Sequence, residues 1–539
     1  MGGATTLTES FPETSVVYRN ANYKKDQNQT AVSVAPGEGK IPTDLMRDDT
    51  FDVDGFPHLH PTGRFGLNHP REVKLTKQQY FLQRLQNIDK RWSQNSAYLF
   101  AALYCIERES LERQINISYR RGKLLQGSLH QLEDAYSVFD NVPGTVRYWQ
   151  QKRYEVLAKL EQLGPFQFFF TLSCADKRWD ENFVSILRQK GIKIFYRKQA
   201  SFSQHADAPY NYMPDEIWVK QDGNKEILLK EYLANDNLHE LVRKNVLNIT
   251  MNFDKRVHSF INRIIMPESS PMCTNFYHYS VEFQMRGAGH IHGVLWVNLP
   301  KLEEKFPGLQ MVISKLKNSS TLTEKEKEVA SNFVDAFVTC SLDIEALTDT
   351  VKEVQAHYHT ATCRKHNTTC RFGYPRFPSN KTIIAQPLNK MNFSSERAYI
   401  AEKNKFKVIL DSVKEVLTQL EEEQLKIITI EQILSKANVQ SEDYYAALNV
   451  SQTGACVILK RSPKEIYINN YNPEWLKAWD GNMDLQVCLD FFAIITYITD
   501  YYTKSEAGMM STLKDAAFSC KGKDTRNQIK FMAQTFLNH

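Results

Sequence analysis

The spacing of apolar residues changes several times along the chain, and each change marks an expected element. Apolar residues three or four positions apart predict helices over residues 75–117, 145–163, 180–190, 237–265, 301–355, 407–437 and 484–504. Short apolar or alternating runs predict strands at 166–172, twice within 276–298, at 455–460 and at 465–469. Helices and strands mixed in this way predict an α+β fold.

Composition narrows the class of protein. Of the 539 residues, 42% are hydrophobic and 24% are charged, which excludes wholesale disorder. The net charge of +5 excludes a strongly basic chromatin-type protein but allows a local basic groove. No run of about 20 apolar residues and no signal-peptide pattern occurs, so we expect no membrane span and no secretion. Nine cysteines without a dense disulfide pattern favour an intracellular compartment.

Two histidines lie two positions apart within a predicted strand. The two-residue period of a strand places His290 and His292 on one face, and their imidazoles together suit a divalent metal. The preceding strand offers Glu282 and Gln284 on a single face, and a tight turn would bring that face beside the histidines. Gln284 is then the expected third ligand and Glu282 an alternative. A surface or core pair without metal is the other interpretation.

The helix predicted near the C-terminal end of the chain carries tyrosines away from its apolar stripe. At about 100° per residue, Tyr502 lies on that stripe, whereas Tyr497, Tyr501 and Lys504 share another face. Two phenols beside an ammonium are candidate nucleophiles toward phosphorus, since a nearby cation favours the phenolate. The alternative is the lining of an amphipathic groove. Combined with a metal that polarises a phosphodiester, this face predicts a DNA-nicking site with a covalent phosphotyrosine.

A cluster of cysteines and histidines follows the predicted strands. His357, His359, Cys363 and Cys370 are enough ligands for a closed, structural, tetrahedral Zn²⁺ site, and an intracellular protein favours zinc over a Cys363–Cys370 disulfide. Cys340 or His366 are alternative ligands. Basic residues at this cluster and in the strand-joining turn are candidate DNA contacts or simply solvated charges: Arg286, Arg364, Lys365, Arg371 and Arg376.

Several long blocks, taken in order, carry a family resemblance. They are FFFTLSCADKRWDE at 168–181, SVEFQMRGAGHIHGVLW at 280–296, HYHTATCRKHNTTCRFGYPRFP at 357–378, INNYNPEWLKAWDGNMDLQ at 468–486 and YITDYYTKSE at 497–506. Over roughly residues 50–539 the chain resembles the Rep region of Helitron-type rolling-circle transposases, a branch of the His-hydrophobe-His endonucleases.

The resemblance implies a fold and an activity. The fold is a central antiparallel sheet with flanking helices, the histidine strand in its middle and the tyrosine helix across it. His290 and His292 would bind Mg²⁺ or Mn²⁺, and Tyr497 and Tyr501 would be paired nucleophiles that cut and rejoin single-stranded DNA. The Gln284 position is similar to the third ligand in parvoviral replication initiators. Transposon ends and target DNA are the implied partners, and the implied location is the nucleus. The oligomeric state is left open.

The implied domain order is a flexible tail at 1–50, a mostly helical domain at 51–160, a first part of the nuclease core at 161–300, a helical insertion with the zinc cluster at 301–440 and a second part of the core at 441–539.

Full Helitron transposases continue into a helicase on the same polypeptide. No G-x-x-x-x-G-K-[ST] motif occurs in this sequence, so ATPase and helicase activity are not expected of the chain.

Two other functions compete with a DNA strand-transfer enzyme. One is a nucleic-acid binding module whose sheet stacks bases on aromatic side chains. The other is a catalytically inactive transposon remnant. A binding module needs neither the His290/His292 pair nor the Tyr497/Tyr501/Lys504 face, and a remnant should have lost one of them. Because both features occur together, the enzyme is favoured.

Overall fold

The computed structural model describes residues 48 and 50–120, 146–197, 216–220, 225–234, 236–283, 287–318, 320–360, 363–365, 369–452 and 454–489. The chain divides into two compact units, the first containing the described residues up to 120 and the second those from 146 onward. Each unit has a hydrophobic cluster of its own. The predicted five-part division is finer than this and stays a prediction. No helix in the described ranges is long and apolar enough to span a membrane.

The first unit is helical. It contains α1 (Phe51–Gly55), α2 (Lys77–Leu85) and α3 (Ser96–Arg120). The single helical pattern predicted over 75–117 is therefore interrupted between 86 and 95. A capping box at Thr76 begins α2, and the Asn95 side chain accepts a hydrogen bond from the Tyr98 amide at 2.9 Å, which begins α3.

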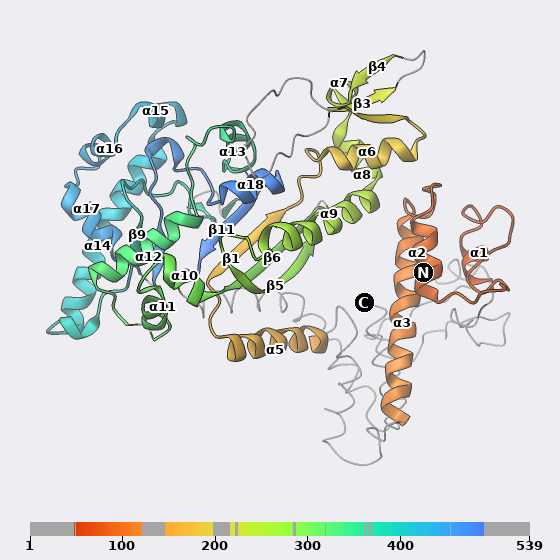
Figure 1. The fold of residues 1–539 in the computed structure, drawn as a ribbon, viewed down its shortest axis with the longest axis horizontal. Coiled ribbons are helices and arrows are strands. Elements are labelled where there is room, and N and C mark those ends of the chain that lie inside the picture. Colours follow the sequence, from red (N-terminus) through yellow and green to blue (C-terminus); the bar gives the residue numbers. More distant parts are fainter. Residues whose placement is uncertain are drawn as a thin grey trace, which may run out of the picture. The chain divides into compact units, whose positions relative to one another are not determined.

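A four-stranded antiparallel sheet lies at the centre of the second unit (Figure 1). Its strands are β1 (Phe168–Ser173), β5 (Thr274–Phe283), β6 (Gly289–Val297) and β11 (Met483–Val487), in the order β11-β1-β6-β5. The strand β6 thus lies between two others. The register pairs Ser173 and Glu282 with His290, and Thr171 and Ser280 with His292. The structure confirms a mixed fold of helices and small antiparallel sheets.

The two faces of this sheet differ in character. Residues directly opposite each other in antiparallel strands share a face, so the register sorts the side chains. One face is apolar, with Phe170 packing on Trp475 and Phe168 on Phe333 and Phe337. The other face carries the histidines, and α5 (Val146–Leu163) packs across one end of it, against Phe169, Val294 and Trp296.

The remaining elements of the second unit surround this sheet or extend from it (Figure 1). The helices are α6 (Asp180–Gln189), α7 (Leu229–Leu233), α8 (Leu238–Lys244), α9 (Val246–Phe260), α10 (Leu299–Lys305), α11 (Leu309–Lys317), α12 (Glu324–Phe337), α13 (Thr348–Val354), α14 (Glu396–Gln419), α15 (Glu422–Ile427), α16 (Ile430–Lys436), α17 (Ser441–Leu448) and α18 (Pro473–Trp479), with a π-helical turn η4 (Ile261–Ile265) and 3-10 turns η5 (Lys390–Asn392) and η6 (Pro463–Glu465). Smaller sheets pair β2 (Ile194–Arg197), β3 (Glu216–Lys220) and β4 (Glu226–Leu228), then β7 (Arg364–Lys365) with β8 (Thr369–Cys370), and β9 (Ile383–Ala385) with β10 (Cys456–Ile458).

Two sequence predictions fail in the second unit. The helix expected from 484 is wrong at its start, because Met483, Leu485 and Val487 alternate along a strand that pairs with β1. The strand expected at 465–469 is also wrong. The buried Arg461 side chain donates hydrogen bonds to the carbonyls of Glu465 and Ile468, so a side chain satisfies groups that a strand ladder would use.

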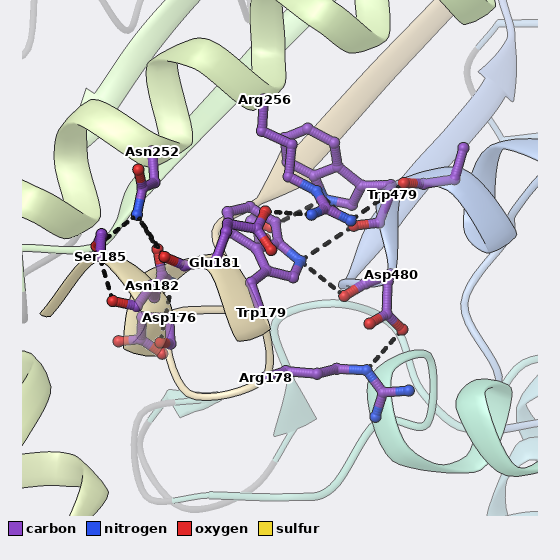
Figure 2. Close-up of polar contacts among 12 residues, drawn as sticks. Asp176, Arg178, Trp179, Glu181, Asn182, Ser185, Asn252, Arg256, Trp479 and Asp480 are labelled. Atoms are coloured by element: carbon purple, nitrogen blue, oxygen red, sulfur yellow. Dashed lines mark hydrogen bonds and ion pairs between the residues drawn. The ribbon is translucent and has the colours of Figure 1, made fainter. Parts of the chain in front are cut away.

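A polar network holds the C-terminal end of β1, where Ser173 lies opposite His290 (Figure 2). The Arg256 guanidinium lies 4.5 Å from the Trp179 ring centroid, pairs with Glu181 and donates to the Trp479 carbonyl at 3.2 Å. The Trp479 indole in turn donates to the Ser173 carbonyl at 2.9 Å. Stacked and hydrogen-bonded aromatic groups of this kind restrain the backbone. The network therefore holds Ser173 in place beside His290.

Candidate metal centres

The histidine pair lies on the polar face of the central sheet, in the middle strand β6. His290 and His292 have ring centroids 4.5 Å apart in an edge-on arrangement. The His290 Nδ1 atom lies 2.9 Å from the Ser173 hydroxyl oxygen, and the His292 Nε2 atom lies 3.1 Å from a Glu282 carboxylate oxygen. Each imidazole is therefore oriented by a side chain from a different neighbouring strand.

Burial keeps His290 uncharged at neutral pH. Desolvation is the main cause that lowers the pKa of His290 to about 4, followed by the proximity of His292, while Glu282 acts in the opposite direction. A neutral imidazole is the form that binds a metal. The 3.1 Å between the His292 nitrogen and the Glu282 oxygen is close to the ~3 Å that separates two ligands of one ion at metal–ligand distances of about 2.1 Å.

The structure brings together some of the predicted catalytic residues. Glu282, the alternative ligand, contacts His292. Gln284 and Arg286 lie outside the described residues. So do Tyr497, Tyr501 and Lys504, and their roles stay predictions. A group of three or more histidine, cysteine or carboxylate donor atoms within 4.8 Å of one another is found at a second place in the described part of the chain, away from the histidine pair.

That second place is the Cys/His cluster. Ligand atoms of His357, His359, Cys363 and Cys370 all lie within 4.8 Å of one another. Cys363 Sγ is 3.4 Å from His359 Nδ1, and Cys370 Sγ is 3.4 Å from His357 Nε2. The Thr360 amide donates to Cys363 Sγ at 3.2 Å. Two thiols and two imidazoles that converge on one point fit the donor set that tetrahedral Zn²⁺ prefers.

Groups around the cluster hold one of its ligands in position. The His357 ring stacks on Tyr374, with centroids 4.4 Å apart, and the Arg376 guanidinium also lies over the Tyr374 ring at 4.9 Å. The Tyr374 hydroxyl donates to Asn469 at 3.2 Å. Burial, and then the proximity of His359, lower the pKa of His357 to about 4. His357 is therefore neutral and oriented before any metal binds.

The structure describes some of the alternative zinc ligands and basic neighbours of the cluster, and it leaves others out. Cys340 is fully buried in the hydrophobic core and its thiol donates to the Lys460 carbonyl, so it is not part of the converging group and that alternative is wrong. His366 lies outside the described residues. Arg371 is exposed, with its guanidinium 4.5 Å from the Phe372 ring centroid. Arg364 and Lys365 form β7, and their side chains lie outside the description.

A comparison with protein families bears on the histidine pair. A family model described as the Helitron helicase-like domain at the N-terminus matches residues 65–295. This match supports a Helitron-related, transposase-like protein. The matched segment contains β1, β5 and β6 up to residue 295, with both histidines, and it ends before the Cys/His cluster. No curated protein matches the chain.

Sequence reasoning missed two groups of the central sheet that lie on the face of the histidines. Ser173 is 117 residues away from His290 in the chain, and only strand pairing brings them together. Asp484 occupies the same row as Thr171 and His292, and burial raises the pKa of its carboxyl to about 6. The helical spacing from 484 predicts a helix over Asp484, whereas the alternation along 483–487 is the signal that indicates its strand.

The partly buried histidine His278 predicts a pH dependence of stability. Desolvation is the first cause that lowers the pKa of His278 to about 4, with Lys159 and Lys152 adding to it and Glu155 opposing. The unfolded chain then binds this proton near pH 6.5 and the folded chain only near pH 4, so the free energy of unfolding falls as pH decreases through that window. His278→Gln should remove on the order of 3 kcal/mol of that decrease. Urea unfolding at pH 7.5 and pH 4.5 measures it, and an equal decrease in both proteins would contradict it.

Proposed function

We propose that this chain is the metal-dependent single-stranded DNA endonuclease and strand transferase of a Helitron-type element. The observation that carries the proposal is the pair His290 and His292, which Ser173 and Glu282 orient on the polar face of a central strand within the Helitron-matching segment. The proposed substrates are single-stranded transposon ends and target DNA, and the proposed location is the nucleus.

The chain's own residues would perform the reaction as follows. Mg²⁺ or Mn²⁺, when bound at His290 and His292, would polarise the scissile phosphodiester. Ser173 holds His290 Nδ1, which leaves Nε2 for the ion, and the Glu282 contact with His292 supports this carboxylate as a further ligand beside the proposed Gln284.

The covalent step belongs to the tyrosine face. The hydroxyl of Tyr497 or Tyr501 would lose its proton and attack phosphorus. The new bond joins the tyrosine oxygen to the 5′ phosphate, the bond to the 3′ oxygen breaks, and that oxygen takes up a proton to leave a 3′ hydroxyl. Lys504 would favour the phenolate. The second tyrosine allows another strand to be cut before the first adduct is resolved.

We also propose that the Cys/His cluster holds one structural Zn²⁺. Its four donors leave no open position for a substrate, which is typical of structural rather than catalytic zinc. The neighbouring Arg371, with Arg364, Lys365 and Arg286, would contact DNA phosphates.

A covalent adduct tests the enzymatic proposal. The protein is incubated with a 3′-labelled single-stranded oligonucleotide and Mg²⁺ or Mn²⁺, then run on a denaturing gel. We expect a labelled protein band that Tyr497→Phe and Tyr501→Phe each reduce, that the double variant lacks, and that Tyr502→Phe leaves unchanged. Binding of the oligonucleotide without any adduct would instead support a nucleic-acid binding module, and an adduct in the double variant would remove the tyrosines from the mechanism.

A further inference from the structure

A lysine from helix α5 reaches the same sheet face as the histidine pair. The Lys159 Nζ atom lies 3.3 Å from His278 Nδ1 on strand β5. In the sheet register His278 pairs with Val294, and the next residue on that face, Ser280, pairs with His292. His278 and His292 are therefore diagonal neighbours on one face, about 7 Å apart. Lys159 thus places an ammonium group close to the proposed cleavage site.

The position of Lys159 is fixed by packing on both sides. Helix α5 buries Trp149, Leu157 and Leu160 against the sheet, in a cluster that includes Phe169 and Val294. Phe169 also stacks near the His292 ring, with centroids 6.2 Å apart. The helix that carries Lys159 and the strand that carries His292 therefore share one small apolar contact, which limits the movement of one relative to the other.

The charge of Lys159 has no acidic partner among the ion pairs found in the described ranges. Its contact, His278, is a partly buried imidazole whose pKa is lowered to about 4, so it is neutral at pH 7. Glu155, a carboxylate one turn earlier on α5, pairs with Lys152 at 2.8 Å. An ammonium group beside an uncharged acceptor can still pair with an anion. On a face that is proposed to bind a nucleic acid, the anion of matching chemistry is a backbone phosphate.

We propose that Lys159 binds a backbone phosphate of the single-stranded DNA next to the phosphate that is cleaved, and that His278 positions its ammonium group. This inference rests on the proposed function and adds a second contact for the same substrate. Lysine acts at such a site as a point charge, so the contact adds affinity and registers the strand without reading its sequence.

Salt-dependent binding tests this contact. The affinity for a fluorescent oligothymidine is measured against KCl concentration with no divalent metal added, for the wild-type chain, Lys159→Met and Lys301→Met. Lys301 is a matched control, since it is a lysine of the same unit that pairs with Glu268 at 3.4 Å. Loss of one phosphate contact should make the slope of log affinity against log salt shallower by about 0.7, with affinity about fivefold weaker at low salt. Lys301→Met should keep the wild-type slope.

The outcomes separate this inference from the proposed function. A wild-type chain that binds no oligothymidine would overturn the proposed function and the contact with it. Wild-type binding with an unchanged slope in Lys159→Met would overturn the Lys159 contact alone. Lys159→Arg, which keeps the charge, should restore the slope. Lys159→Gln provides the same comparison if thermal unfolding shows that the methionine variant does not fold.

Discussion

Replacing His290 and His292 together by alanine should abolish metal-dependent cleavage of single-stranded DNA. A bound metal supplies several kcal/mol of transition-state stabilisation, so we expect the cleavage rate to fall by at least about 10³-fold. Binding of the oligonucleotide should persist, because Lys159 and the other basic contacts are unchanged. The comparison is made by single-turnover cleavage in Mn²⁺, with oligonucleotide binding measured in parallel.

The structure requires a stability control for this variant. His292 is only 6% exposed and lies beside Phe169. Its truncation should therefore lower the free energy of unfolding by about 1–2 kcal/mol. His258→Ala, at an exposed position of α9, controls for loss of a histidine. Cleavage by a folded double variant at the wild-type rate would remove the histidine pair from the active site.

Removal of zinc should destabilise the protein more than any single surface substitution. We expect about one tightly bound Zn²⁺ per chain, which metal analysis of the purified protein measures. Cys370→Ser should lose the ion and several kcal/mol of local stability, because the loop around His357 and Tyr374 depends on the cluster. The melting temperature should fall by on the order of 5–10 °C, while the rate of the nicking step changes less.

The chain offers a matched control for the zinc prediction. Cys456 is an exposed cysteine outside the cluster, so Cys456→Ser should keep both the zinc and the melting temperature. Folded wild-type protein without zinc would contradict the assignment. Equal losses in the Cys370→Ser and Cys456→Ser variants would show that the effect comes from thiol chemistry rather than from the cluster.

The sequence predicted the parts of the sheet whose signals are local. Alternation along 276–298 indicated two strands, and the structure pairs them with Glu282 opposite His290. The aromatic run at 166–172 indicated β1 because it is short, rich in aromatic residues and preceded by Gly164-Pro165. Local spacing also indicated the Cys/His cluster. His357, His359, Cys363 and Cys370 lie within fourteen residues, which limits how far apart their side chains can be.

Features that depend on long-range pairing could not be predicted. Nothing near Ser173 indicates that it orients His290, because the contact exists only once β1 and β6 are paired. The 483–487 segment is followed by an apolar run of helical spacing, and that stronger local pattern concealed a short strand. The buried guanidinium of Arg461 likewise replaced an expected strand at 465–469 with turns.

The strand order also determines how this protein can fold. β11 pairs with β1, although Ser173 and Asn482, which meet at the ends of these strands, are 309 residues apart in the chain. On the ribosome, the edge of β1 that pairs with β11 therefore stays open until nearly the whole second unit has been synthesised. Such contacts slow folding, and an unpaired edge invites association with other chains. A fragment that contains the histidine strand but ends before residue 483 should accordingly aggregate, and the shortest soluble piece of this sheet must include β11.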